Sequence, residues 1–466
     1  MFDLDRMRKD KPVHFVGIGG CNMSALAAAL HQRGYTVTGS DIANGPNVRA
    51  LTQAGIQVSI GHASSNLPDS TQLVVASLAA VGRTNPEVLQ GEERGVRTVD
   101  RAELLASIMA QHAKSIAVSG TRGKSTTTSL VAAVFVAAGL DPTVSVGTTA
   151  DQGNYRNGGG RHAVVEACEY HRAFLYTHPS AVLILNVVHG DHGDYFKNEE
   201  DTHSAFRDFA GKIRPGGLLV TSADCPVART ITAPQGRRVT FGLAETADYR
   251  AEITSWHDGS ARFTVFHRGT AMGELAPRLL GEHNVTNILG AVAMGHQHGL
   301  ELDQMRDAVE AFAGAPRRLQ HLGIRNGVRI YDDKACTPGE AAATMAAIRR
   351  ATPGNIAVVL RPTSFSRVRD LLSEYPDPFV KGDRIVVTDI YPGRDTEDFG
   401  MHARDVVRVL AEAGLDAQYV PDNGTAPDVE AVCAYVSRWA RDVSALVTFG
   451  PNDVAQVGRA YLDGQG

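Results

Sequence analysis

The sequence predicts an α/β protein of three domains, each built around a parallel β-sheet. Two glycine-rich turns support this prediction, because each follows a short apolar strand and precedes a helical stretch, as in nucleotide-binding α/β units. The first turn covers 17–22 and the second covers 120–125. A third series of alternating strands and helices begins near Arg317. A chain of 466 residues is long enough for two to four domains of about 100–200 residues each.

Composition narrows the classes of function. Hydrophobic residues make up 43% of the chain and charged residues 21%, which suits a globular protein with a core in each domain. The net charge of −5 lacks the basic excess of a nucleic-acid or anionic-membrane binder. The five widely spaced cysteines form no CxxC motif, which favours a reduced compartment. Without a signal peptide or a membrane-length apolar run, we expect a cytoplasmic monomer or homodimer that binds small molecules.

The first domain, predicted over 1–110, carries the weaker of the two turns. The turn starts a GxGxxG pattern at Gly17 but has Asn22 in place of the third glycine. Asp41 ends the next strand, where an NAD-binding protein holds a ribose, so a dehydrogenase is one alternative. A pyrophosphate bound at the helix N-terminus, or a bare structural turn, explains the same glycines. We expect strands over 14–18, 34–41 and 73–77 and helices over 23–32 and 101–109.

The second domain, predicted over 111–316, carries the strongest motif. The strand 115–119 leads into a glycine-rich loop and then into a helix over 126–138. Glycines let backbone N–H groups approach phosphate oxygens, and the helix N-terminus adds partial positive charge. Lys124 would neutralise the β- and γ-phosphates, and the Ser125 hydroxyl would face Mg²⁺. We therefore predict an ATP site formed by Gly120, Thr121, Gly123, Lys124, Ser125 and Thr126.

Polar residues follow the later strands of this domain. Glu166 ends the strand 163–166, where a carboxylate suits Mg²⁺, although a solvated glutamate is an alternative. His189 and His192 follow the strand 181–186, at the edge where α/β sheets place their sites. Zinc is conceivable for this histidine pair, but no further ligand pair stands out in the sequence. We favour His192 as a neighbour of magnesium or phosphate.

Further polar residues lie at the start of a helix and around the third domain. His283, Asn284 and Asn287 begin a helix, and taken alone they could form only an N-cap. Arg317 and Arg318 precede the third domain, predicted over 317–466, and could clamp phosphate. Asp332 and Asp333 end a strand and could hold a ribose or magnesium. For the arginine pair and for the aspartate pair alike, a surface position without a ligand is an alternative. We expect strands in this domain over 328–332, 355–360, 384–388 and 445–449, with antiparallel strands earlier, over 249–275.

Taken together and in this order, these motifs resemble those of the Mur ligases. The resemblance runs from about Lys11 to the end of the chain and is strongest to the alanine-adding members. It implies an N-terminal Rossmann-like UDP-substrate domain, a central P-loop ATPase with a parallel sheet, and a C-terminal Rossmann-like acceptor domain. It also implies ATP and Mg²⁺ as cofactors. In the first domain, the residues that it assigns to the UDP substrate are Gly19, Gly20, Asp41, His62 and Ser77.

The resemblance also assigns roles in the ATP site and in catalysis. Lys124 matches the lysine of the ATP phosphates, and Ser125 matches the hydroxyl that faces magnesium. Glu166 and His192 match metal-site residues. In the adenine and ribose site, the matching residues are His283, Asn284 and Asn287 of an H-N-x-x-N segment, Arg318 after the domain junction, and Asp333. The resemblance thereby implies four catalytic residues, namely Lys124, Glu166, His192 and Arg318.

The acceptor region departs from the family pattern. Where members read D-D-Y-x-H-H-P-T-E, this chain has Cys336 and Thr337 in place of both histidines. Where they read P-H-R-F-x-R-x-R, it has Thr363 and Ser364 in place of His and Arg and keeps Arg367. We predict a working ligase whose amine acceptor is altered, with Cys336, Thr363, Ser364 and Arg367 lining the substrate site. A ligase of specialised metabolism with a non-muramoyl carboxylate donor, and a non-catalytic nucleotide-binding regulator, are the further alternatives.

Overall fold

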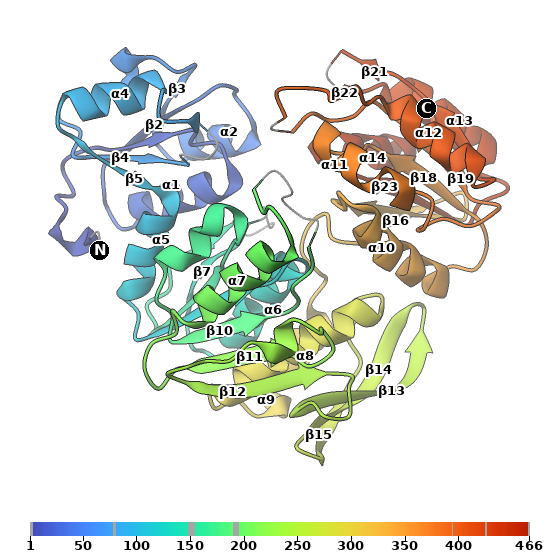
Figure 1. The fold of residues 1–466 in the computed structure, drawn as a ribbon, viewed down its shortest axis with the longest axis horizontal. Coiled ribbons are helices and arrows are strands. Elements are labelled where there is room, and N and C mark those ends of the chain that lie inside the picture. Colours follow the sequence, from blue (N-terminus) through green and yellow to red (C-terminus); the bar gives the residue numbers. More distant parts are fainter. Residues whose placement is uncertain are drawn as a thin grey trace. The chain divides into compact units, whose positions relative to one another are not determined.

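The computed structural model describes residues 3–77, 81–147, 154–189, 195–393, 395–424 and 426–464 (Figure 1). The chain divides into two compact units. The first holds the residues up to His189 together with Asn198–Arg250 and Ile288–Ala308, and the second holds Ala251–Asn287 and the residues from Val309 onward. Each predicted α/β region contains a parallel-rich sheet of its own, which confirms the fold class. The predicted domain boundaries stay a prediction.

The N-terminal sheet is parallel, and its central strands are buried. Strands 13–16 (VHFV) and 73–76 (LVVA) are short and mostly apolar, as expected where helices cover both faces of a sheet. In spatial order β1 lies between β2 and β4. The strands after β1 are therefore added first on one side of it (β2, β3) and then on the other (β4, β5). The strands, in spatial order, are β3 (Gln57–Ile60), β2 (Val37–Asp41), β1 (Val13–Val16), β4 (Leu73–Ala76) and β5 (Arg97–Asp100).

Helices pack on both faces of this sheet (Figure 1). One core contains Leu26 and Leu104 from two helices together with Phe15 and Val75 from the strands. On the other face, Val88 packs with valine and alanine side chains of β1 and β4. This three-layer arrangement leaves the carboxyl ends of the strands open to loops, where α/β proteins bind ligands. The helices are α1 (Cys21–Gln32), α2 (Pro46–Gln53), α4 (Pro86–Glu93) and α5 (Arg101–Ala110).

Gly39 of β2 has no room for a side chain. A Cβ atom there would lie 2.6 Å from the Phe15 carbonyl oxygen and 2.7 Å from the Ile18 side chain. We expect Gly39→Ala to lower the free energy of unfolding by about 1–3 kcal/mol, because the paired strand must shift. The control is Gly45→Ala, where a Cβ would meet nothing within 4 Å. Urea unfolding measures both, and equal stability of the two variants would contradict the packing argument.

The central sheet is parallel in its middle and antiparallel at both ends. From β7 to β13 the strands are parallel, whereas β7 and β8 form one antiparallel pair and β14 and β15 another. The antiparallel strands expected over 249–275 are thus found in β14 and β15, but β13 pairs in parallel with β12. In spatial order the strands are β8 (Tyr155–Arg156), β7 (Thr143–Ser145), β9 (His162–Glu166), β6 (Lys114–Ser119), β10 (Ala181–Ile184), β11 (Leu218–Ser222), β12 (Arg237–Gly242), β13 (Tyr249–His257), β14 (Ser260–His267) and β15 (Thr270–Leu275). The helices are α6 (Lys124–Ala137), α7 (Glu199–Ala210), α8 (Glu282–Gln297) and α9 (Leu302–Ala311).

The C-terminal sheet has an apolar core on each face. One core gathers residues of α10 and α12, and the other gathers residues of α13 and α14. Thr337 and Glu340 form a capping box at the start of α10, which fixes the loop that precedes it. In spatial order the strands are β16 (Gln320–Arg325), β17 (Val328–Asp333), β23 (Ala445–Phe449), β18 (Ile356–Leu360), β19 (Arg384–Val387) and β20 (Asp416–Tyr419). The helices are α10 (Pro338–Ala351), α11 (Phe365–Leu371), α12 (Ala403–Glu412), α13 (Val429–Trp439) and α14 (Ala455–Asp463).

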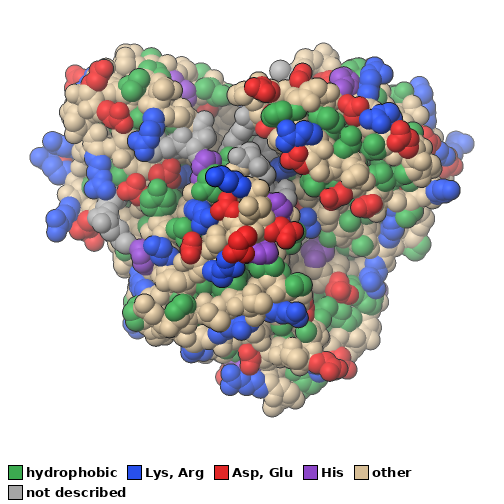
Figure 2. Space-filling view, viewed as in Figure 1, with side chains coloured by type: hydrophobic (Ala, Val, Ile, Leu, Met, Phe, Trp, Pro, Cys, Tyr) green, Lys and Arg blue, Asp and Glu red, His purple; other side chains and the backbone are tan. Residues whose placement is uncertain are grey.

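The surface carries charges of both signs. Acidic and basic side chains intermix over the face shown in Figure 2. In the part of the chain that the structure describes, no helix combines the length and apolarity needed to cross a membrane.

Candidate active site

The predicted phosphate loop joins β6 to α6, in the strand–turn–helix arrangement that the sequence indicates. Gly120 and Gly123 have φ angles of +142° and +83°, which favour glycine. A Cβ on Gly120 would also lie 3.1 Å from the backbone nitrogen of Asn186, so this turn leaves no space for a side chain. Gly123 is the N-cap of α6, and Lys124 is the first residue of that helix. The backbone therefore presents a helix N-terminus at the carboxyl edge of the sheet, which favours anions.

Lys124 lies across its own loop and contacts a buried carboxylate. Its ammonium group donates to the carbonyl oxygens of Gly120 at 2.6 Å and Thr121 at 3.1 Å. It also forms an ion pair with Glu169 at 2.9 Å, and the Glu169 side chain is only 3% exposed. Glu169 is a site residue that the sequence argument missed. The second carboxylate of the Glu166-Ala-Cys-Glu169 segment, three residues after the first, is the signal that could have revealed it.

Asn186 fixes the outer side of the loop. Its side-chain oxygen accepts from the backbone nitrogen of Arg122 at 2.8 Å, and its amide donates to the Arg122 carbonyl at 3.1 Å. The backbone N–H of Val188 donates to the Thr121 hydroxyl at 2.9 Å. The segment after β10 is thus hydrogen-bonded to the loop, and the side chains of Asn186 and Thr121 make these contacts beside the predicted phosphate site. Ser125 and Thr126 are buried in the first turn of α6.

Glu166 ends β9, which pairs directly with β6. Its carboxylate accepts from the backbone N–H of Gly147 at 2.8 Å. Cys168, two residues further on, is half-buried, and desolvation raises the pKa of its thiol to about 11, so it stays protonated at neutral pH. Glu166 lies at the predicted edge, and its metal role stays a prediction.

The predicted histidines after β10 are only partly described. His189 accepts or donates a hydrogen bond with the Thr202 hydroxyl at 3.1 Å, so it joins the loop to α7. His192 lies outside the described residues. Among the residues that are described, no group of three or more His, Cys, Asp or Glu side chains comes together as a metal-binding cluster.

The predicted adenine-site residues lie at the start of α8. The Asn284 amide donates to the Leu280 carbonyl at 2.9 Å, and the Asn287 amide donates to the Asn284 oxygen at 2.9 Å. Both asparagines are buried. Burial lowers the pKa of His283 to about 4, so its imidazole is neutral at pH 7. A neutral ring and two ordered amides can recognise an uncharged base, whereas a charged imidazolium would favour phosphate.

Arg317 and Arg318 have different environments. The Arg317 guanidinium pairs with the buried Asp332 at 2.7 Å and donates to the Gly450 carbonyl at 2.8 Å. It therefore joins the start of the third region to the loop after β23. Arg318 acts electrostatically on Asp333, whose carboxylate it favours. Arg317 therefore has a structural role in connecting these segments. The phosphate role of Arg318 stays a prediction.

Asp333, the predicted ribose ligand, is buried and holds the same junction. One of its oxygens accepts from the Leu319 backbone at 2.9 Å and from the Thr344 hydroxyl at 2.7 Å. Burial raises the pKa of Asp333 to about 6, although Arg318 and these hydrogen bonds favour ionisation. The carboxylate therefore connects the junction to α10 in this structure. Its contact with a nucleotide stays a prediction.

The raised pKa of Asp333 predicts a pH dependence of stability. An unfolded aspartate titrates near pH 3.9, so between about pH 4 and 6 the folded chain retains a proton that the unfolded chain has lost. The contribution of Asp333 to the free energy of unfolding is therefore full below this window and declines as pH rises through about 6. Asp333→Asn cannot ionise, and its amide oxygen can accept both hydrogen bonds. In urea unfolding across this window we expect the variant to lack that decline; parallel curves for the two proteins would refute the assignment.

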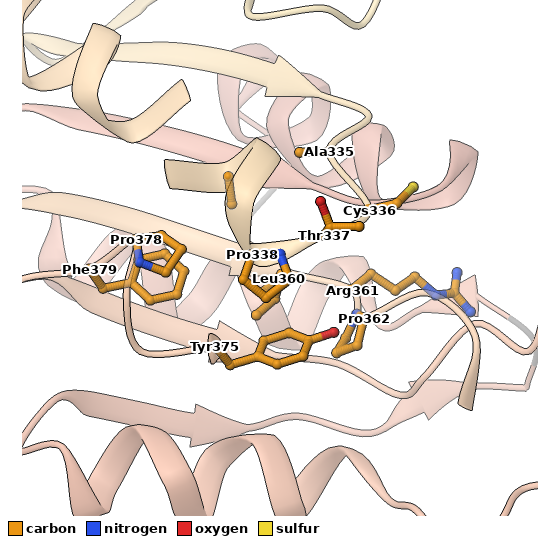
Figure 3. A pocket seen from close by; sticks show the side chains of 11 residues that line it. Ala335, Cys336, Thr337, Pro338, Leu360, Arg361, Pro362, Tyr375, Pro378 and Phe379 are labelled. Carbon is orange, nitrogen blue, oxygen red and sulfur yellow. The ribbon is translucent and has the colours of Figure 1, made fainter. Parts of the chain in front are cut away.

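A small pocket lies beside the altered acceptor segment (Figure 3). It is formed where the loop before α10 meets the end of β18 and the segment after α11. Figure 3 shows the Tyr375 side chain extending along the pocket with its hydroxyl end on the side of Pro362. The Arg361 guanidinium is engaged by Asp422 at 2.6 Å and Asp453 at 2.9 Å. The lining is mostly apolar and consists of Ala335, Cys336, Thr337, Pro338, Ala341, Leu360, Arg361, Pro362, Tyr375, Pro378 and Phe379.

The predicted acceptor residues gather around Cys336. Its thiol donates to the Lys334 carbonyl at 3.2 Å, and burial raises its pKa, while Arg367 and Thr363 oppose this shift. Cys336 is half-buried, and a thiol whose pKa is raised is protonated at neutral pH and therefore a weak nucleophile, which agrees with a lining role. The fourth residue, Ser364, has a φ of +61° and its hydroxyl accepts from the Arg367 backbone at 3.4 Å, at the start of α11. Of the four predicted residues, Cys336 lines the pocket of Figure 3, whereas Thr363 and Arg367 act on its thiol without lining that pocket. Ser364 caps α11, and its contact with an acceptor stays a prediction.

In the N-terminal region, the predicted turn residues hold one another. The Gly19 backbone donates to an Asp41 oxygen at 2.8 Å, and a Cβ on Gly19 would lie 2.9 Å from that oxygen. Gly20 is the N-cap of α1. His62 follows β3 and contacts the Ser40 hydroxyl at 2.9 Å. Ser77 follows β4, and its carbonyl accepts from the Val81 backbone at 3.0 Å. All of these lie at the carboxyl edge of the sheet, so the geometry suits a ligand there while their substrate contacts stay predictions.

Comparison with known proteins agrees with this architecture. Three family models match in order: Mur ligase family, catalytic domain, at 12–113; Mur ligase middle domain at 118–295; and Mur ligase, glutamate ligase domain, at 317–452. The UDP-N-acetylmuramate–L-alanine ligase of Acetivibrio thermocellus is 35% identical over 97% of this chain and 96% of its own length. That of Caldanaerobacter subterraneus subsp. tengcongensis is 33% identical over 98% of both chains.

Solved structures give the same result. The UDP-N-acetylmuramate–alanine ligase of Thermotoga maritima superposes with a TM-score of 0.81 and 27% identity, over 98% of this chain and 99% of that chain. A murein peptide ligase of Psychrobacter arcticus shares the fold, with a TM-score of 0.70 and 21% identity over 97% and 98% of the two chains. The fold and the matches together define an ATP-dependent enzyme that forms carbon–nitrogen bonds. The chain belongs to the Mur ligase family, which sets aside the dehydrogenase and the non-catalytic regulator.

Proposed function

We propose that this ligase joins the carboxylate of a UDP-N-acetylmuramate-like donor to an amine other than alanine. The donor half rests on full-length similarity to UDP-N-acetylmuramate–L-alanine ligases. The acceptor half rests on the replaced family positions: Cys336 and Thr337 line the pocket, and Thr363 and Ser364 directly follow its Pro362. Both substrates are small molecules. The observation that carries the proposal is an intact phosphate loop in a chain whose acceptor segment has changed.

ATP and Mg²⁺ fit the residues at the edge of the central sheet. The two glycines with positive φ give the loop a backbone cradle for phosphate, and Lys124 supplies a cation beside it. The Ser125 hydroxyl and the carboxylates of Glu166 and Glu169 are hard oxygen donors on the neighbouring elements α6 and β9 and the segment after β9. Mg²⁺ is typically held by one or two carboxylates together with phosphates. Bound Mg²⁺ would offset phosphate charge, and the role predicted for His192 falls under the same proposal.

The reaction proposed for the chain has two steps. The donor carboxylate oxygen attacks the γ-phosphorus of ATP, ADP leaves, and an acyl phosphate of the donor results. The amine nitrogen then attacks the acyl carbon, loses a proton, and inorganic phosphate leaves as the amide forms. Lys124 stabilises the negative charge spread over the transferring phosphoryl oxygens, and we assign the same role to Arg318. No protein nucleophile takes part, which agrees with protonated thiols at Cys168 and Cys336.

The altered acceptor follows from charge. An arginine that pairs with a substrate carboxylate contributes on the order of 2–5 kcal/mol in a buried site, so its replacement by Ser364 weakens an amino-acid acceptor of the family type. Arg361 is nearby but is already paired with two aspartates. A carboxylate placed against the apolar lining would be poorly solvated. We therefore expect alanine to be a poor acceptor, by up to about a thousandfold.

Trapping of the acyl phosphate tests the donor independently of the acceptor. The enzyme is incubated with ATP, Mg²⁺, UDP-N-acetylmuramate and hydroxylamine, and products are weighed by mass spectrometry. We expect ADP and the hydroxamate of the donor, and neither in a Lys124→Met control. If ADP and hydroxamate form only with a different carboxylate, the non-muramoyl alternative replaces the proposed donor.

A further inference from the structure

A buried carboxylate in the N-terminal domain accepts hydrogen bonds from three other segments of the chain. Glu87, in the first turn of α4, is fully buried. One oxygen accepts from His14 at 3.1 Å and from the Ser40 hydroxyl, and the other accepts from the Asn66 amide at 2.8 Å and the Ala63 backbone at 3.1 Å. A buried charge that makes this many hydrogen bonds holds the surrounding groups in one arrangement. None of the residues argued for the phosphate site or the acceptor pocket takes part.

Glu87 is ionised at neutral pH. Burial opposes ionisation, but the hydrogen bonds from His14, Ser40 and Asn66 outweigh it and lower the pKa of Glu87 to about 2. An ionised carboxylate is only an acceptor, so the single hydroxyl proton of Ser40 must point to Glu87. The Ser40 oxygen is then left to accept.

These hydrogen-bond roles determine which ring nitrogen of His62 carries the proton. Nδ1 of His62 lies 2.9 Å from the Ser40 oxygen and 3.5 Å from a Glu87 oxygen. Both neighbours are acceptors toward His62, so Nδ1 carries the proton. In the neutral ring, Nε2 is then an unprotonated acceptor. The His62 side chain is 17% exposed, so this ring is anchored at one edge and reaches solvent.

The ring lies where a nucleotide would meet this domain. His62 follows β3 and Ser40 lies in β2, both at the carboxyl edge of the parallel sheet. The same edge carries the Gly19–Asp41 turn and the N-terminus of α1, beside the point where strand order reverses between β1 and β4. Ligands of parallel α/β sheets bind outside these strand ends.

We propose that Glu87, acting through Ser40, is a positioning residue that presents His62 Nε2 as a hydrogen-bond acceptor to an N–H or O–H group of the donor's uridine diphosphate part. The inference rests on the proposed donor. Glu87 and Ser40 orient the ring and fix its tautomer, and His62 touches the substrate. The contact discriminates ligands that offer a donor at this place from ligands that offer only acceptors, because two acceptors cannot pair.

The tautomer can be read without any substrate. In ¹⁵N NMR of the full-length protein, we expect the His62 signals to show a protonated Nδ1 and an unprotonated Nε2, assigned by their loss in His62→Gln. In Ser40→Ala we expect the two tautomers to mix. A protonated Nε2 in the wild-type enzyme would overturn the inference.

Binding of UDP and donor kinetics test the ligand contact. By calorimetry with UDP, we expect His62→Ala and Ser40→Ala each to weaken binding about tenfold, and Ser40→Thr, which keeps the hydroxyl, to restore it. The KM for the donor should rise with little change in kcat, because the contact is the same in ground and transition states. Ser107→Ala is the control, because this buried hydroxyl accepts from the Leu4 backbone and lies outside the group. It should leave UDP binding unchanged.

The outcomes separate this inference from the proposed function. If the hydroxamate of the UDP-linked donor forms but Ser40→Ala and His62→Ala bind UDP as the wild type does, the positioning role is wrong and the proposed function stands. If UDP does not bind the wild-type enzyme and no hydroxamate forms, the proposed donor fails, and the ligand assigned to His62 fails with it.

Discussion

Replacement of Lys124 by methionine is expected to lower kcat for ATP-dependent ligation by about a thousandfold. Lys124 is the cation in the strand–loop–helix turn, and its ammonium contacts the Gly120 and Thr121 carbonyls. Removing one preorganised charge-stabilising group from a transition state costs about 10²–10³ in rate. Methionine keeps the length of the side chain, so the loss reports charge. Phosphate release with saturating donor and acceptor measures it.

The same substitution also lowers the stability of the enzyme without substrates, so a control variant is needed to separate this effect from the loss of catalysis. Without Lys124, the buried Glu169 loses its ion-pair partner, which should lower the melting temperature. Lys114→Met is the matched control, because Lys114 begins the strand whose other end leads into the loop. We expect it to retain activity within about twofold, since it lies far from the phosphate edge. If Lys124→Met kept more than a tenth of wild-type activity while folded, the loop would not be the phosphate site.

Restoring the family residues at the acceptor site is expected to raise alanine use by about a hundredfold. The variant combines Cys336→His, Thr363→His and Ser364→Arg, which restores one residue of the first altered segment and both residues of the second. Thr337 is left unchanged because it caps α10. A restored arginine can pair with the alanine carboxylate, and about 2–3 kcal/mol of that pairing corresponds to the expected gain. We expect kcat/KM for the native acceptor to fall at the same time.

Ethylamine, which is alanine without its carboxylate, separates charge pairing from general improvement. The triple variant should gain with alanine and not with ethylamine. Ser364 caps α11, so its loss costs about 0.5–2 kcal/mol of stability, and thermal unfolding checks that the variant folds. Wild-type activity with alanine at the level of its native acceptor would contradict the altered site from the outset.

The phosphate loop could be predicted because its chemistry is contiguous. Two glycines, a lysine and a serine lie within six residues, between an apolar strand and a helix, so local pattern determines local geometry. The three α/β regions could be predicted for the same reason, since buried parallel strands are short apolar runs that alternate with helices.

The partners of these motifs could not be predicted, because they depend on tertiary contacts. Glu169 reaches Lys124 from the segment after another strand, 45 residues along the chain. Glu87 connects α4 to residues of three other segments, and its Asn85-Pro86-Glu87 sequence predicts only a helix start. The Asp41 carboxylate accepts from the backbone N–H groups of Gly19 and Ala43, contacts that its place at a strand end does not reveal, and its substrate contact stays a prediction. Side-chain direction at a strand end is set by the loops around it.

The most direct test of the altered acceptor is a competition experiment. The enzyme is given ATP, Mg²⁺, UDP-N-acetylmuramate and an equimolar mixture of the common amino acids and simple amines, and the conjugates are weighed by mass spectrometry. We expect the dominant conjugate to carry an amine other than alanine. A dominant alanine conjugate, formed with high kcat/KM, would contradict it and assign this chain to the same reaction as its alanine-adding relatives.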